Sequence, residues 1–127
     1  MERIEQIRSV VEAYAAAHSA GDVDAIASLF ATDAVVADPV DQPEMVGRDA
    51  VRDFFAGTHQ GIEGFELRIT GPIRAVGSFA AVPLQAETTI GGTTMLIDII
   101  DVFTFDDDGL ITDMRAYWTA SDIRVKA

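Results

Sequence analysis

The feature of this chain that most constrains its fold is a change in hydrophobic pattern near residue 63. Before this point, apolar residues recur at three- and four-residue spacings, the period of an amphipathic helix. After it, long runs of strand-forming residues are separated by short turns that contain glycine. We expect strands over residues 64–75, 78–90, 93–106 and 110–120, with turns at Gly77-Ser78, at Gly91-Gly92 and in the sequence DDDG.

The first half of the chain predicts three helices and one short strand. The helices are expected over residues 3–19, 23–31 and 47–59, and the strand over residues 33–39. Pro39 cannot donate to a continuing strand, so it ends the strand. Helices followed by a run of strands indicate an α+β fold, in which one curved sheet wraps around the helices. No repeat or linker divides residues 1–127, which we expect to form a single domain.

The composition excludes several classes of function. The net charge is −12, with 21 acidic and 9 basic residues, and such a surface repels nucleic acids and anionic membranes. The chain has no cysteine and two histidines, and no cluster has metal-ligand spacing, so we expect neither a metal nor a cofactor. No apolar run is long enough for a membrane span or a signal peptide. We therefore expect a cytoplasmic protein with a neutral or apolar partner.

Two aspartates interrupt the apolar strand pattern of residues 93–106. Alternation places Asp101 on one face with Ile99 and Phe103, and Asp98 on the opposite face. Burial disfavours the charged form of a carboxyl group, so Asp101 is expected to be protonated. A protonated acid in an apolar pocket is a hydrogen-bond donor suited to an oxyanion. From alternation alone, the alternative of a structural aspartate that accepts bonds from a backbone turn or an arginine is favoured.

Two further residues could carry chemistry. Tyr14 lies on the inward stripe of the first helix, where it is either a core tyrosine with a satisfied hydroxyl or a phenol directed into a cavity. Asp38 precedes Pro39, so it is either a turn residue or a carboxylate at the mouth of a pocket. On the last strand Met114 and Trp118 share one face, where they would pack in the core or line a flat apolar wall.

These residues, in their sequence contexts, resemble those of the Δ5-3-ketosteroid isomerase family. The resemblance covers most of the chain and includes the tyrosine of the first helix, "AGDVDAIASLFATDAVVADPV", "GR" followed by "VRDFF", "GPIRAV" and "IDVFTFDDDGLITDMRAYW". The family belongs to the nuclear-transport-factor-2-like superfamily, whose mixed sheet forms a cone around the helices and encloses an apolar cavity. The resemblance implies that Asp38 is the general base, and that Tyr14 and Asp101 form the oxyanion hole.

The implied reaction converts a 3-oxo-Δ5-steroid into its 3-oxo-Δ4 isomer without a cofactor. Some family members have tyrosines that support the helix tyrosine, where this chain has Phe30 and Phe55. By analogy, the cavity is expected to be lined by Phe54, Phe103, Met114 and Trp118. Family members are homodimers that associate through the outer face of the sheet, and the apolar residues Leu96, Ile100 and Val102 are consistent with such a face.

Two other functions remain open from the sequence. A polyketide cyclase or a related proton-transfer enzyme would keep an aspartate base but does not need both Tyr14 and Asp101 as donors. A non-catalytic small-molecule-binding protein of the same fold would leave three polar groups in an apolar cone without an explanation.

Overall fold

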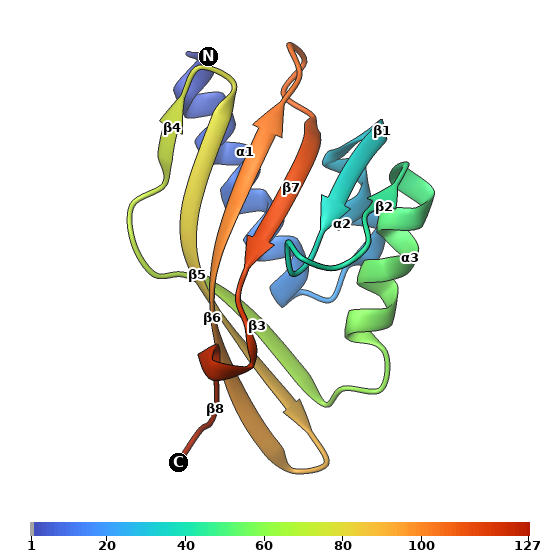
Figure 1. Cartoon of the computed structure of the whole chain (residues 1–127), viewed down its shortest axis with the longest axis vertical. Coiled ribbons are helices and arrows are strands. Elements are labelled where there is room, and N and C mark those ends of the chain that lie inside the picture. The colour runs from blue at the N-terminus through green and yellow to red at the C-terminus, as the bar shows by residue number, and fades with distance from the viewer. Residues whose placement is uncertain (1) are drawn as a thin grey trace.

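The computed structural model describes residues 2–127. Three helices pack on one side of a large curved sheet (Figure 1). The helices are α1 (Arg3–Ser19), α2 (Val23–Ser28) and α3 (Arg48–His59). The strands are β1 (Phe30–Ala37), β2 (Met45–Val46), β3 (Gly64–Ile69), β4 (Arg74–Val76), β5 (Phe79–Ile90), β6 (Thr93–Phe105), β7 (Ile111–Tyr117) and β8 (Ile123–Val125), and a short 3₁₀ helix, η1 (Ala120–Asp122), precedes β8.

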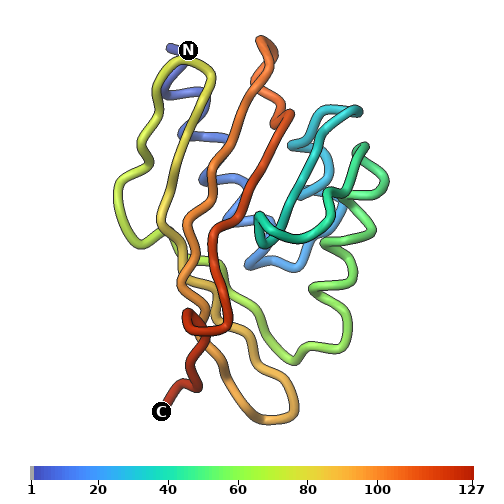
Figure 2. Tube along the Cα trace, in the orientation of Figure 1, coloured from blue at the N-terminus to red at the C-terminus, as the bar shows by residue number. Residues whose placement is uncertain are grey.

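The sheet is mixed and unclosed, as the α+β prediction requires. Its main path runs β2-β1-β7-β6-β5-β3, with β4 paired to β5 and β8 paired to β6. All pairs are antiparallel except β1 with β7, which is parallel. The Cα trace shows how β5 and β6 bend along their length, so that the sheet curves around the helices as a cone (Figure 2).

The expected hairpin turn at Gly91-Gly92 is confirmed. Both glycines have positive φ, at 59° and 79°, and they join Ile90 to its paired residue Thr93. Two consecutive residues with positive φ define the type I′ turn, whose twist matches that of the strands. The turn therefore fixes the register of the two longest strands, on which one wall of the cavity is built.

The predicted ends of the second helix and of the last strand are wrong, and one strand was not predicted; pairing between distant segments accounts for these differences. The second helix ends at Ser28 rather than at residue 31, because Phe30 already pairs with Ile111 of β7. The last strand ends at Tyr117 rather than at residue 120. The chain then adds β8, which the pattern did not indicate, along the part of β6 that β7 leaves unpaired.

The predicted strand over residues 64–75 is two strands, β3 and β4, that both pair with β5. The break faces Pro83 of β5, whose carbonyl accepts a hydrogen bond from the Thr70 N–H at 3.0 Å. In a strand the N–H and C=O of one residue point to the same neighbouring strand. Because proline has no N–H, Pro83 can accept a hydrogen bond from the β3 side but cannot donate one to it. The ladder stops there and resumes at Arg74.

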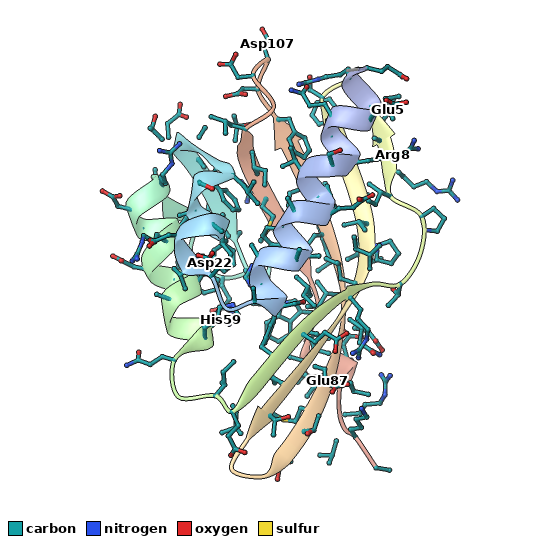
Figure 3. All side chains as sticks on the ribbon, turned by 180° about the vertical axis from the view of Figure 1, so that it is seen from behind. Glu5, Arg8, Asp22, His59, Glu87 and Asp107 are labelled. Carbon is teal, nitrogen blue, oxygen red and sulfur yellow. The ribbon has the colours of Figure 1, made fainter. Side chains whose placement is uncertain are left out.

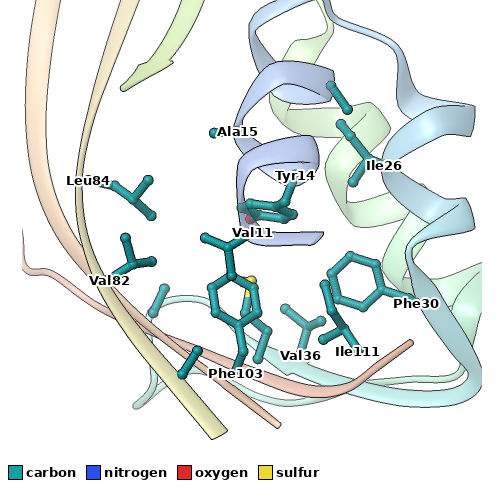
Figure 4. Close-up of a cluster of buried hydrophobic side chains, with 14 of the residues drawn as sticks. Val11, Tyr14, Ala15, Ile26, Phe30, Val36, Val82, Leu84, Phe103 and Ile111 are labelled. Atoms are coloured by element: carbon teal, nitrogen blue, oxygen red, sulfur yellow. The ribbon is translucent and has the colours of Figure 1, made fainter. Parts of the chain in front are cut away.

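The hydrophobic core lies between α1 and the concave face of the sheet. Figure 4 shows Val11 and Tyr14 of α1 above Phe103 of β6, with Val82 and Leu84 of β5 on one side and Phe30 on the other. These side chains are buried, and several are fully excluded from solvent. Within residues 2–127, no helix has the length and apolar character needed to cross a lipid bilayer.

Candidate active site

A cavity of about 240 Å³ lies between the helices and the inner face of the sheet. Most of its wall is apolar, and this part includes Phe55, Phe65, Leu67, Ala86, Ile97 and Ile99. Its polar groups come from Tyr14, His18, Asp38, Thr58, Thr88, Asp101 and Trp118. Ile90, which is about half exposed, lies at its outer end beside the β5–β6 turn. The structure thus brings together the three residues that the sequence singled out, from α1, β6 and the end of β1.

Asp101 lies in the middle of the sheet, paired with Val82 on one side and Ala116 on the other. Its side chain faces the cavity and the residue is only 3% exposed. Burial raises the pKa of Asp101 well above its usual value, and the nearby charge of Asp38 raises it further. Burial therefore favours the neutral carboxylic acid, and in that form Asp101 is a hydrogen-bond donor.

Tyr14 is held by aromatic contacts on several sides. Its ring meets Phe103 edge-on at 5.4 Å between centroids, and Phe55 and Phe30 at 6.1 and 6.2 Å. Such edge-to-face contacts favour one orientation of the ring. Burial raises the pKa of the phenol well above its usual value, and negative charge on Asp101 or Asp38, where either is ionised, raises it further. The hydroxyl stays protonated.

Phe30 and Phe55 therefore support Tyr14 by packing rather than by hydrogen bonding. Within residues 2–127, no hydrogen bond joins the Tyr14 hydroxyl or the Asp101 carboxyl to another protein group. Both donors line the cavity. A ligand oxygen that entered it could accept a hydrogen bond from each without displacing a protein partner.

Asp38 follows directly after β1, at a cis Asp38–Pro39 peptide bond. The indole Nε1–H of Trp118 donates a hydrogen bond of 2.7 Å to its Oδ1. Burial raises the pKa of Asp38, and the hydrogen bond from Trp118 partly offsets this because it stabilises the carboxylate. Asp38 is thus a base whose proton affinity is increased by its apolar surroundings.

The contact between Trp118 and Asp38 was not predicted from the sequence. It depends on the parallel pairing of β1 with β7, which aligns Ala37 with Arg115 and brings the residues after both strands together. The sequence indicated that Trp118 could line the cavity, and it does so. No spacing pattern in the sequence indicates that the indole N–H of Trp118 also donates a hydrogen bond to Asp38, which is 80 positions away.

Three of the four expected cavity liners lie elsewhere. Phe103 and Met114 are fully buried in the core, where Phe103 packs beneath Tyr14. Phe54 is half-buried on α3 and contacts Phe55. These three residues are not among those around this cavity: the ring of Tyr14 packs against Phe103, and Phe55, the next residue of α3, lines the cavity.

Asp98 lies on the outer face of the sheet, as alternation predicted. It is exposed and bonded to Arg124 at 2.7 Å and to Gln85 at 3.1 Å. These bonds lower the pKa of its carboxyl group, with Arg124 as the larger cause. Asp98 therefore joins β6 to β5 and β8 and has no access to the cavity.

A histidine pair is the feature of the site that sequence reasoning missed. His18 Nδ1 and His59 Nε2 are 2.9 Å apart, so one ring donates to the other. His18 lies one helical turn after Tyr14, and their rings meet edge-on at 4.6 Å. The only available signal was that His18 continues the inward stripe of the first helix.

The fold and the site have the form of an enclosed small-molecule site, and comparison with known proteins shows the family. The SnoaL-like domain family matches residues 11–114, and this chain belongs to it. A steroid Delta-isomerase from Nocardioides simplex is 36% identical over 120 residues, which span 94% of this chain and 95% of that protein.

Other relatives are connected with a different chemistry. The epoxide hydrolase LasB from Streptomyces lasalocidi is 31% identical over 113 residues, or 82% of this chain, but the match spans only 38% of LasB. The solved structure of SalBIII, an epoxide hydrolase/cyclase-like enzyme with a role in pyran ring formation in salinomycin, has a TM-score of 0.90 and 32% identity. It covers 99% of this chain and all of that one. The same fold thus hosts isomerases as well as cyclases and hydrolases.

Proposed function

We propose that this protein isomerises 3-oxo-Δ5-steroids to 3-oxo-Δ4-steroids by moving a proton from C4 to C6. The observation that carries the proposal is that one apolar cavity holds a proton acceptor and two hydrogen-bond donors. Asp38 is a carboxylate base, whereas Tyr14 and Asp101 are buried donors that burial keeps protonated. The similarity to a steroid Delta-isomerase over nearly the full length of both chains supports it.

Asp38 performs the proton transfer. The C4–H bond of the substrate lies between a carbonyl and a double bond, so its removal gives a conjugated dienolate. The carboxylate takes the C4 proton, becomes a carboxylic acid, and returns the proton to C6, so the double bond moves into conjugation with the ketone. One group can do both steps because the carboxylate is regenerated at the end. Its raised pKa lies closer to the pKa of the substrate C4–H, which favours the proton transfer.

Tyr14 and Asp101 stabilise the intermediate. The negative charge of the dienolate is on the steroid O3, which accepts a hydrogen bond from each donor. Both donors are fixed before the substrate binds, Tyr14 by its aromatic neighbours and Asp101 by its place in the middle of the sheet. A single preorganised donor of this kind contributes roughly 3 kcal/mol to the stability of a transition state.

A second candidate is the opening of an epoxide, favoured by the similarity to LasB and SalBIII. In that reaction Asp101 would donate its proton to the epoxide oxygen while Asp38 accepted a proton from the attacking hydroxyl or water. The C–O bond of the ring breaks as the new C–O bond forms. Tyr14 is not required as a second donor, which is why we favour the isomerase.

A comparison of two substrates separates these reactions. The purified protein is given a 3-oxo-Δ5-steroid in one assay and a hydroxy-epoxide in another, and the products are followed by conjugated-enone absorbance and by chromatography. We expect enone formation that Asp38→Asn reduces roughly a hundred- to ten-thousandfold, while the variant still binds a phenolic steroid. Ring opening of the epoxide without enone formation would favour the second candidate instead.

We also propose that the protein is a cytoplasmic homodimer that associates through the outer face of the sheet. Val76, Phe79, Ile100 and Tyr117 are exposed apolar side chains on neighbouring strands of that face. Exposed apolar side chains grouped on one face are typical of an interaction surface. Sedimentation velocity tests this, and Ile100→Glu is expected to convert the dimer to a monomer.

A further inference from the structure

The buried histidine pair, which the proposed chemistry does not use, lies on the cavity wall. His18 is 4% exposed and belongs to α1, whereas the half-buried His59 is the last residue of α3. The bond between His18 Nδ1 and His59 Nε2 joins the two helices at this point. The end of α1 is also bound to β3, because Ser19 Oγ accepts a hydrogen bond from the Leu67 N–H at 2.9 Å. His18 is therefore held in one position.

The other ring nitrogen of His18 has no partner. Nε2 is buried and makes no hydrogen bond to any group of residues 2–127. A buried polar group without a partner costs roughly 1–3 kcal/mol, and a ligand group that reached Nε2 would remove this cost. The bond at Nδ1 directs Nε2 away from His59, and His18 is part of the cavity lining.

The ligand group at this point must be neutral. Burial and, as the smaller cause, the neighbouring His59 together lower the pKa of His18 to about 3, so the imidazole carries no charge at physiological pH. No lysine or arginine lines the cavity in the part of the chain that the structure describes. The carboxylate of Asp38 is on the same cavity, so an anionic group would be repelled.

A hydroxyl group fits better than a carbonyl. If His59 donates to His18, Nε2 of His18 carries a proton and is a donor. If His18 donates to His59, Nε2 is an acceptor. A hydroxyl can accept in the first case and donate in the second, whereas a carbonyl can serve only the first.

We propose that His18 Nε2 binds a hydroxyl group of the substrate, set one helical turn from the ketone that reacts. This inference rests on the isomerase proposal, because it takes the ketone to be bound at Tyr14 and Asp101. Tyr14 and His18 are four residues apart on one face of α1, a rise of about 6 Å. The hydroxyl therefore belongs to the ring that carries the ketone or to the adjacent ring, not to the far end of the steroid.

The test measures binding of the product class to the protein and to His18→Leu. Trp118 is the single tryptophan and lines the cavity, so its fluorescence reports binding. The ligands are an unhydroxylated 3-oxo-Δ4-steroid and a set of monohydroxylated forms that cover each position on the first two rings. We expect at least one hydroxylated form to bind about tenfold more tightly than the parent, and His18→Leu to abolish this preference, so that the parent and the hydroxylated forms bind the variant equally well.

A second measurement keeps the test informative if the variant does not fold. The chain has two histidines, so ¹⁵N-histidine labelling gives resonances from only two rings. We expect the Nε2 resonance of His18 to shift with the preferred hydroxylated steroid and not with the parent. Equal shifts with both ligands, or an equal hydroxyl preference in protein and variant, would overturn the inference.

The two proposals fail in different ways. If the parent steroid binds and its Δ5 isomer is turned over, but no hydroxylated form is preferred, only the hydroxyl site is wrong. If no steroid binds, the isomerase proposal is wrong and the hydroxyl site falls with it.

Discussion

Replacing Trp118 with phenylalanine isolates the hydrogen bond that holds the proposed base. The change removes the indole N–H that donates to Asp38 Oδ1 at 2.7 Å and keeps an aromatic ring on the cavity wall. A hydrogen bond to a charged acceptor contributes about 1.5–3 kcal/mol. Only the carboxylate form of Asp38 gains this stabilisation. Burial already raises the pKa of Asp38, and loss of the hydrogen bond raises this pKa further.

The magnitude follows from the same free energy. Since 1.4 kcal/mol is a factor of ten, the ratio of ionised to protonated Asp38 falls roughly tenfold to hundredfold. The active form is the carboxylate, so activity is lost as the pH falls through the Asp38 pKa. In Trp118→Phe this loss begins at a higher pH, whereas the rate at alkaline pH is retained because the base is stronger once it is ionised.

The assay is the pH profile of kcat/KM for enone formation, measured for the protein, for Trp118→Phe and for Tyr117→Phe. Tyr117 is the adjacent residue on the opposite face of β7 and is about half exposed, so its variant should keep the original profile. An acid limb that stays in place in Trp118→Phe would mean that the indole N–H does not stabilise the Asp38 carboxylate. A uniform loss of rate at every pH would show that the indole acts by packing alone.

The remaining predictions concern the donors and the outer face. Tyr14→Phe is expected to reduce kcat roughly a hundredfold with little change in KM, since it removes a bond that strengthens in the transition state; an unchanged kcat would remove Tyr14 from the mechanism. Asp101 holds a proton in the folded state that the unfolded chain releases above its ordinary pKa of 3.8, so stability falls as the pH rises. Relative to Asp101→Asn, the unfolding free energy measured by urea denaturation should fall by about 1.4 kcal/mol per pH unit between the unfolded-state and the folded-state pKa of Asp101. Plots of unfolding free energy against pH that are parallel for the two proteins would contradict this. Asp98→Asn should leave kcat/KM unchanged, because its side chain lies on the outer face.

Local patterns were enough to predict the elements that position two of the three site residues. The inward stripe of α1 placed Tyr14, and alternation along β6 separated Asp101 from Asp98, because both periods are properties of a single segment. Two glycines with positive φ specify the β5–β6 turn directly from their residue type. The view from behind shows α1 lying across the sheet (Figure 3), and Ile7, Val11 and Tyr14 of its inward stripe are buried.

Features that depend on pairing between distant segments were not predictable in the same way. The parallel register of β1 and β7 creates the contact between Trp118 and Asp38, and it also ends α2 early. The histidine pair needs the ends of α1 and α3 to meet, across 41 residues of sequence. Which aromatic residue reached the cavity was decided by one position on α3, where Phe55 rather than Phe54 points inward.

A substrate labelled with deuterium at C4 shows whether Asp38 moves the proton from C4 to C6. If Asp38 carries the proton from C4 to C6 while Tyr14 and Asp101 hold the dienolate oxygen, enone formation from the labelled steroid is slower than from the unlabelled one. A measurable share of the label is then found at C6 of the product by NMR. Enone formation with no isotope effect and no label at C6, or the absence of enone altogether, would contradict the account.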